Sequence, residues 1–288
     1  MRIKVLLAAS LLLCSLYAWA RPSKSTIVKK QFKSEILGIE KNYAVYLPAG
    51  YADSGHDYPV LYLLHGAGQN YTSWLENGNM QEVTDRVLAE GMALPMIIVM
   101  PDAKGYDEKD RGDLMGYFNR PGWNYEDFFF KEFVPFIENA YRIRAQKNSR
   151  AIAGLSLGGL GSFSYALHHP DMFSSCCSLS GLLSDLRENH IQRTPELYRQ
   201  SIIENDPYTI ISKATEAELA SFRTVRWYID VGDDDDGLAP KNMDMFTLMM
   251  EKKIPRQYRM RGGSHTWDYW TTALPYVLTY VSIGFAQQ

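Results

Sequence analysis

The segment "AIAGLSLGGLGSF", residues Ala151–Phe163, decides the fold because it joins an apolar, strand-like run to a helix start rich in small residues. Residues 154–158 read GLSLG and match G-x-S-x-G, the pattern of a sharp strand-to-helix turn that exposes a serine hydroxyl. The five-residue pattern alone is common by chance. Its position between a strand and a helix makes Ser156 a candidate nucleophile.

Apolar runs of strand length alternate with helix-like segments on both sides of this turn. The expected buried strands are "YPVLYLLHG", "MIIVMPDA", "SRAIAGLS", "SSCCSLSG" and "VRWYIDVG". Two earlier strands, "TIVKKQFKSEILG" and "KNYAVYLPAGY", are expected to pair antiparallel at one edge. The alternation predicts an α/β fold with a mainly parallel central sheet and helices on both faces.

Three further segments are expected to be helical. "MQEVTDRVLAEG" should end at Gly91, and "NYEDFFFKEFVPFIENAYRI" should begin with Asn124 as N-cap. Pro135 lies inside the second pattern, so a kink or a restart is expected there. The polar, mixed segment Leu182–Ser221 is expected to be a helical insertion above the sheet.

The first twenty residues have the features of a secretory signal. Arg2 and Lys4 precede an apolar run that ends in Ala-Trp-Ala, and Val5–Trp19 spans only 15 residues. A bilayer-spanning helix needs roughly 20 residues, so a membrane anchor is the less favoured alternative. We expect a signal peptide over residues 1–20 and a single domain over 21–288, exported to the periplasm or the medium without a stable anchor.

The composition is that of an ordinary globular protein, with 46% hydrophobic and 22% charged residues and a formal net charge of −3. Loss of Arg2 and Lys4 with the signal would change this charge to −5. No nucleic-acid partner is therefore expected. Cys176 and Cys177 are adjacent, which suits neither a disulfide framework nor a metal site, and we expect them to be small buried residues.

A serine nucleophile requires a base and an acid, which follow it in the order Ser, Asp or Glu, His. His265 lies in "RMRGGSHTWDYW", just after the last strand-like segment. The acid loop "WYIDVGDDDDGL" offers four aspartates, Asp233–Asp236. One of them can turn toward the histidine while the others stay in water. A calcium site in this run is the alternative.

The strand "VLYLLHGAG" ends in H-G-A-G, residues 65–68, which matches a loop that places a backbone N–H opposite the nucleophile. The amides of Ala67 and Leu157 are therefore candidates for the oxyanion hole. His65 is then expected to shape this loop and not to act as a base.

Aromatic residues gather in "GYFNRPGWNYEDFF", after the "MIIVMPDA" strand. Tyr117, Phe118 and Trp123 are candidates to line a sugar or phenolic site, since ligands bind at the carboxyl edge of such sheets. The alternative is that they pack the start of the next helix against the core.

With these motifs located, the chain resembles the esterase D-type branch of the α/β-hydrolases. It is similar to carbohydrate esterase family one, which includes feruloyl esterases and acetyl xylan esterases. The resemblance implies that Ser156 is the nucleophile and His265 the base. It also implies that the acid is Asp235, three residues after Gly232, with Asp234 and Asp236 as alternatives.

The resemblance further implies a serine esterase that acts on acylated plant polysaccharide such as xylan, without metal or organic cofactor. Three alternatives stay open: an esterase for a siderophore or another small acyl ester, an acyltransferase, and an inactive carbohydrate-binding member of the family.

Overall fold

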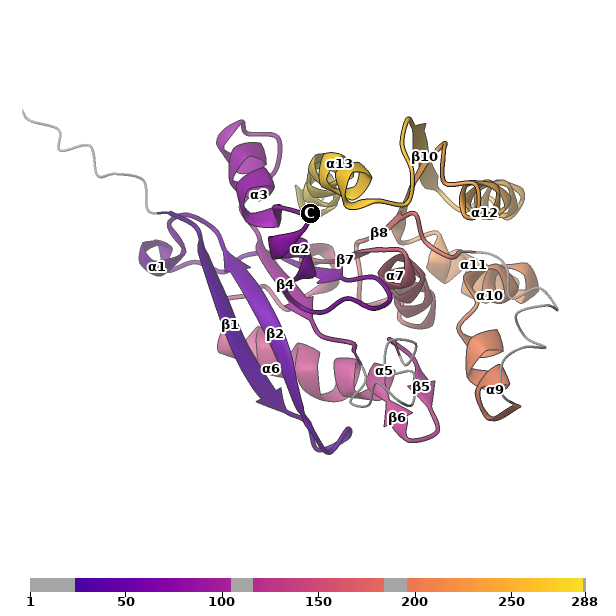
Figure 1. Cartoon of the computed structure of the whole chain (residues 1–288), viewed down its shortest axis with the longest axis horizontal. Helices are drawn as coiled ribbons and strands as arrows, with labels where there is room; N and C mark the ends of the chain where they lie inside the picture. Colours follow the sequence, from indigo (N-terminus) through magenta and orange to yellow (C-terminus); the bar gives the residue numbers. More distant parts are fainter. Residues whose placement is uncertain (1–23, 105–115, 184–195, 287–288) are drawn as a thin grey trace, which may run out of the picture.

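The computed structural model describes residues 24–104, 116–183 and 196–286, and its centre is an eight-stranded sheet (Figure 1). The strand order is β1-β2-β4-β3-β7-β8-β9-β10. The strands of this sheet are β1 (Thr26–Lys33), β2 (Glu40–Leu47), β3 (Val60–Leu64), β4 (Ile97–Pro101), β7 (Arg150–Leu155), β8 (Ser175–Leu179), β9 (Arg226–Gly232) and β10 (Arg256–Arg261).

Strand directions follow the predicted pattern. The β1–β2 and β2–β4 pairs are antiparallel, and every other pair in this sheet is parallel. The prediction of a mainly parallel sheet with an antiparallel N-terminal edge is therefore confirmed. Because β3 and β7 are parallel neighbours, with Leu64 opposite Gly154, the loop after β3 and the turn after β7 emerge at the same edge.

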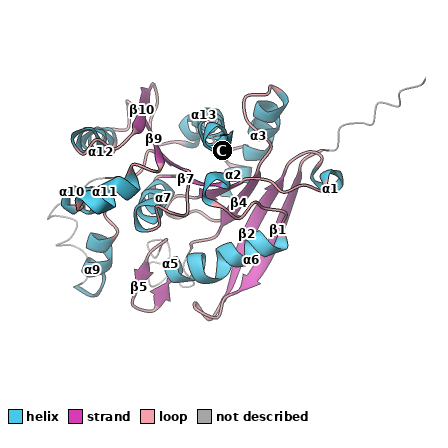
Figure 2. Ribbon diagram, turned by 180° about the vertical axis from the view of Figure 1, so that it is seen from behind, coloured by secondary structure: helices cyan, strands magenta, loops and turns pink. Residues whose placement is uncertain are grey.

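Helices cover both faces of the sheet, as predicted. One face packs against α2 (Ser73–Glu76), α3 (Met80–Ala89) and α13 (Trp267–Ala286), and the other against α5 (Tyr125–Phe128), α6 (Val134–Ala140), α7 (Leu157–His168) and α12 (Ala239–Glu251). Figure 2 shows these layers from behind, with α3 and α13 on the opposite side of the strands from α5 and α6. Successive side chains of β3 point to opposite faces of the sheet. Leu61 and Leu63 pack on the face covered by α3 and α13, and Tyr62 and Leu64 pack on the other face.

The predicted break at Pro135 takes the form of a wider helical turn. Between α5 and α6 the chain forms one π-helical stretch, Phe129–Phe133, in which the Val134 amide donates to the Phe129 carbonyl. Pro135, near the start of α6, has no N–H with which to continue the α-helical pattern. Asn124 is the N-cap residue of α5, as predicted, and its side chain makes no capping hydrogen bond.

The connection from β8 to β9 contains three helices in its described part, which confirms that the predicted insertion is helical. It contains α9 (Glu196–Glu204), α10 (Pro207–Lys213) and α11 (Glu216–Phe222). Thr215 and Glu218 form a capping box at the start of α11. Residues 184–195 of the predicted insertion lie outside the described residues.

The remaining short elements are α1 (Tyr51–Ser54), a 3₁₀ turn (Lys147–Ser149) and a two-residue hairpin of β5 (Asn119–Arg120) with β6 (Trp123–Asn124), which the sequence pattern did not predict. Cys176 and Cys177 are fully buried free thiols of β8, as expected. In the described part of the chain, no helix combines the length and apolarity needed to cross a membrane. The predicted signal peptide, residues 1–20, lies outside it.

Candidate active site

Ser156 occupies a strained turn between β7 and α7. Its φ of 51° and ψ of −118° lie outside the regions that L-residues normally adopt. The turn is held by its backbone, because the Ser156 amide donates to the Leu179 carbonyl at 2.8 Å. Close packing explains both flanking glycines: a Cβ on Gly154 would lie 2.3 Å from the Gly158 carbonyl oxygen, and one on Gly158 would lie 2.5 Å from that of His65.

The hydroxyl of Ser156 begins a chain of hydrogen bonds through two predicted partners. Its Oγ lies 3.0 Å from His265 Nε2, and His265 Nδ1 lies 2.8 Å from Asp235 Oδ2. A carboxylate only accepts, so Nδ1 carries the proton and Nε2 is free to accept the serine proton. The indole of Trp270 lies edge-on to the imidazole, with ring centroids 4.9 Å apart.

The four aspartates of the acid loop point in different directions. Asp235 is the one that contacts His265, and only 6% of its surface is exposed. Asp233 accepts a hydrogen bond from the Gly263 amide at 3.0 Å, and Asp234 and Asp236 are exposed to solvent. Among the residues that the structure describes, no group of three or more His, Cys, Asp or Glu side chains is arranged to hold a metal ion.

The acid loop and the histidine loop are bonded directly to each other. The Asp233 amide donates to the Arg261 carbonyl at 3.0 Å, and the Asp234 amide donates to the Gly263 carbonyl at 2.9 Å. The approach is so close that a Cβ on Gly232 would lie 2.1 Å from the Gly263 oxygen. Asp235 and His265 therefore belong to one interlocked pair of loops.

A buried charge cluster lies beneath these loops. Asp230 of β9 is completely buried, and it accepts hydrogen bonds from the hydroxyls of Tyr228 and Tyr269 and from Arg261 Nη2, at 2.9 and 3.0 Å. Burial, and then the Asp230 charge, raise the pKa values of both tyrosines, so both remain donors. Burial alone would lower the pKa of Arg261, but its bond to Asp230 raises it. The cluster joins β9, β10 and α13. The loop after β9 carries Asp235, and the loop between β10 and α13 carries His265.

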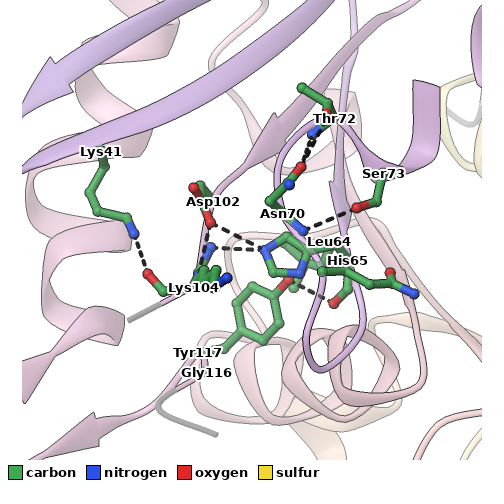
Figure 3. Close-up of polar contacts among 12 residues, drawn as sticks. Lys41, Leu64, His65, Asn70, Thr72, Ser73, Asp102, Lys104, Gly116 and Tyr117 are labelled. Carbon is green, nitrogen blue, oxygen red and sulfur yellow. Dashed lines mark hydrogen bonds and ion pairs between the residues drawn. The ribbon is translucent and has the colours of Figure 1, made fainter. Parts of the chain in front are cut away.

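His65 shapes the loop after β3, as predicted. Figure 3 shows its ring between this loop and the end of β4. Nε2 accepts the Ala103 amide proton at 2.9 Å, so Nδ1 carries the ring proton, and it lies 2.8 Å from the Gly66 carbonyl oxygen. The Tyr117 hydroxyl donates to the His65 carbonyl at 2.8 Å. Both ring nitrogens are therefore occupied within the protein, which leaves neither free to act as a base.

Two charged side chains lie behind His65. The Asp102 carboxylate lies 3.7 Å from His65 Nε2 and accepts the Lys104 amide at 2.9 Å, while the Lys41 ammonium donates to the Lys104 carbonyl at 2.6 Å (Figure 3). Burial alone would raise the pKa of Asp102, but the charge of Lys41 and the hydrogen bond from the Lys104 amide act in the opposite direction, and the pKa of Asp102 lies below its ordinary value. Burial lowers the pKa of Lys41 against the opposing effect of Asp102. The loop thus packs against two buried, charged side chains.

The two predicted oxyanion donors lie on neighbouring segments. Leu157 is the first residue of α7, so its amide has no acceptor within the helix. Ala67 lies in the loop after β3, whose His65 carbonyl is in contact with Gly158 at the start of α7. The structure therefore brings both segments to the edge of the sheet where Ser156 lies.

The three aromatic candidates are placed in the core. Tyr117, Phe118 and Trp123 are 0%, 3% and 5% exposed. Trp123 stacks on Tyr125 with ring centroids 5.7 Å apart, and its Nε1 donates to the Gly116 carbonyl. These contacts fit the alternative that they pack the start of the helix against the core, and they correct the expectation that the three side chains line a sugar or phenolic site.

Sequence reasoning missed the Asp230 cluster and the Lys41–Asp102 support. A signal for the first was present, since an aspartate inside the apolar strand "WYIDVG" requires a buried partner. Its partners Arg261 and Tyr269 flank the histidine loop, 31 and 39 residues further along the chain.

A Ser-His-Asp chain at the carboxyl edge of a mainly parallel sheet, beside an H-G-x-G loop, defines an α/β-hydrolase. The family model described as "Putative esterase" matches residues 34–280. The chain therefore belongs to this esterase family.

Individual relatives point the same way. A solved ferulic acid esterase matches with a TM-score of 0.84 and 37% identity, over 92% of this chain and 100% of that one. The "Endo-1,4-beta-xylanase/feruloyl esterase" of Xylanibacter ruminicola is 35% identical over 170 residues, which is 57% of this chain and 23% of that protein. An acetyl esterase of Caldicellulosiruptor saccharolyticus is 23% identical over 266 residues, 85% of this chain and 93% of that protein. The match thus spans about a quarter of the Xylanibacter protein.

Proposed function

We propose that this chain is an exported serine esterase that removes feruloyl or acetyl groups from plant polysaccharide such as xylan, with Ser156, His265 and Asp235 as its catalytic residues. The observation that carries the mechanism is the hydrogen-bonded chain from Ser156 Oγ through both nitrogens of His265 to Asp235. The strained backbone at Ser156 supports it, since such strain is typical of a nucleophile turn.

In acylation, Ser156 Oγ attacks the ester carbonyl carbon and its proton passes to His265 Nε2. The carbonyl π electrons move to the oxygen, and the amides of Ala67 and Leu157 bind the resulting oxyanion. Asp235 accepts the hydrogen bond from His265 Nδ1–H throughout and stabilises the imidazolium. Collapse of the intermediate breaks the bond to the sugar oxygen, which takes the proton from His265.

In deacylation, water attacks the acyl-enzyme and gives its proton to His265 Nε2. The second intermediate collapses, the carboxylic acid leaves, and the proton returns to Ser156 Oγ. Water is the co-reactant of the overall hydrolysis, and no oxidant or reductant takes part. The interlocked acid and histidine loops keep the imidazole in one orientation through both halves of the cycle.

The substrate class is supported by the relatives. The proteins that this chain resembles are named as a ferulic acid esterase, a xylanase/feruloyl esterase and an acetyl esterase. Export is supported by the first twenty residues, in which two basic residues precede a short apolar run and a small-x-small triplet. A polymeric substrate of plant cell walls is met outside the cell, so the two parts of the proposal agree.

The test uses acetylated and feruloylated xylan fragments with wild type and Ser156→Ala, and the released acid is measured. Wild type should release at least one of the two acids, and Ser156→Ala should lose several orders of magnitude in rate while its melting temperature stays close to that of wild type. Release of neither acid by an enzyme that hydrolyses a small aryl ester contradicts the substrate class. Turnover by Ser156→Ala near the wild-type rate contradicts the mechanism.

A further inference from the structure

His65 and the oxyanion donor Ala67 are separated by one peptide unit whose orientation the structure fixes. The proton on His65 Nδ1 is donated to the Gly66 carbonyl oxygen at 2.8 Å. We propose that His65 is a positioning residue that sets the direction of the Ala67 N–H by holding the carbonyl of the same peptide. This inference rests on the proposed function, in which the Ala67 amide binds the oxyanion.

The physical reason is the planarity of the peptide bond. The Gly66 carbonyl and the Ala67 N–H belong to one peptide unit, which is trans, since no described peptide bond is cis. In a trans unit the C=O and the N–H point in opposite directions within one plane. A hydrogen bond that fixes the carbonyl therefore fixes the N–H on the far side, away from His65. Donation to the carbonyl also polarises the unit and strengthens its N–H as a donor.

The loop residues are small, and the Gly66 carbonyl has two donors: the Gln69 amide at 3.3 Å, which closes the turn, and His65 Nδ1 at the shorter distance of 2.8 Å. The Gly66–Ala67 unit joins a glycine to an alanine, and Gly68, which follows, has a φ of 70°. The peptide before it is held separately, since the Gly66 amide donates to Gln69 Oε1 at 2.9 Å. With both sides of Gly66 fixed, the Ala67 N–H keeps one direction before substrate arrives, as electrostatic preorganisation requires.

The ring of His65 is itself fixed on its opposite side. Nε2 accepts the Ala103 amide at 2.9 Å, and only 4% of the residue is exposed. The backbone is held by Tyr117, whose hydroxyl donates to the His65 carbonyl at 2.8 Å (Figure 3). The ring thus connects the end of β4 to the oxyanion loop, and it touches none of the reacting atoms.

Two amide variants separate the two ring nitrogens. His65→Asn places an amide donor close to the position of Nδ1, and His65→Gln places an amide acceptor close to that of Nε2. For hydrolysis of an aryl acetate we expect His65→Asn to keep kcat within about threefold of wild type. We expect His65→Gln to lose about tenfold to a hundredfold in kcat, with little change in KM, because the lost interaction is made in the transition state. The pH dependence of kcat should be unchanged, since His265 and Asp235 are not touched.

Tyr117→Phe is the matched control, because it removes a buried hydrogen bond from the same loop but from the preceding peptide. Melting temperatures show whether each variant is folded, and Tyr117→Phe should lose less kcat than His65→Gln. The inference is overturned if His65→Gln retains wild-type kcat, if His65→Asn is no more active than His65→Gln, or if Tyr117→Phe loses as much as His65→Gln. Ser156→Ala in the same assay tests the proposed function separately: if it remains active, the mechanism fails whatever the His65 variants do.

Discussion

Replacing Asp235 by asparagine tests the assignment that the sequence left among several aspartates. The variant keeps the size of the side chain but removes the charge that accepts the His265 Nδ1 proton at 2.8 Å. An asparagine amide donates as readily as it accepts, so the imidazole can take the other tautomer, with its proton on Nε2. In that tautomer Nε2 is a donor and no longer accepts the proton of Ser156.

The expected loss in kcat is about 10⁴-fold, the size found when the acid of such a triad becomes an amide, and it corresponds to about 5.4 kcal/mol of barrier. Asp234→Asn and Asp236→Asn remove the same charge from the same loop. Their carboxylates are exposed and do not contact His265, so we expect both to stay within about twofold of wild type, in the range of ordinary surface substitutions.

The assay is hydrolysis of an aryl acetate at several pH values, with melting temperatures measured for all three variants. The melting temperature of Asp235→Asn should remain close enough to that of wild type to show a folded protein. An equal loss of kcat in all three variants indicates a general charge effect of the loop. A larger loss in Asp234→Asn or Asp236→Asn refutes the assignment of Asp235.

Two further predictions concern α7. Gly158→Ala should lower both the melting temperature and kcat, and it should reduce the free energy of unfolding by about 1–3 kcal/mol. The reason is that its Cβ would lie 2.5 Å from the His65 carbonyl oxygen and 2.7 Å from the Leu64 carbonyl oxygen. An unchanged kcat and melting temperature contradict this prediction. Burial would lower the pKa of His168, but the contact with Glu126 at 2.8 Å raises it above its ordinary value. The contact therefore contributes its full stabilisation at pH values below the pKa of unfolded histidine, about 6.5, and loses it as the pH rises through the pKa of the folded protein. The stability advantage of wild type over His168→Gln, measured by urea unfolding, should therefore be larger at pH 6 than at pH 9, and an equal difference at both pH values argues against the pair.

The order of strands and helices was predictable because a parallel sheet buried on both faces leaves continuous apolar runs in the sequence. The runs at 60–64, 97–101, 150–155, 175–179 and 226–232 all became strands. Ser156 and His265 were predictable as a pair because the fold requires them in that order, each after a strand. The structure brings them within 3.0 Å across 109 residues of chain.

Other features depend on packing that no local pattern records. The four consecutive aspartates have identical side chains, so the sequence does not show which of them points toward His265. The direction of Asp235 depends on the hydrogen bonds between its loop and the loop that carries His265. Tyr117 and Trp123 have side chains that serve equally in a core or on a sugar platform, and only tertiary contacts distinguish the two. Two partners of Asp230 lie on β10 and α13, more than 30 residues away in the sequence, and no local pattern connects them to Asp230.

The helical connection between β8 and β9 has an evolutionary consequence. These strands are adjacent and parallel, with Leu179 opposite Asp230, although α9, α10 and α11 lie between them in the chain. None of the three triad residues belongs to this connection, and its two ends are fixed by the sheet. Its exposed turns can therefore change in length while the catalytic residues stay in place, and Ile211, Leu219 and Phe222 tie its helices to the core.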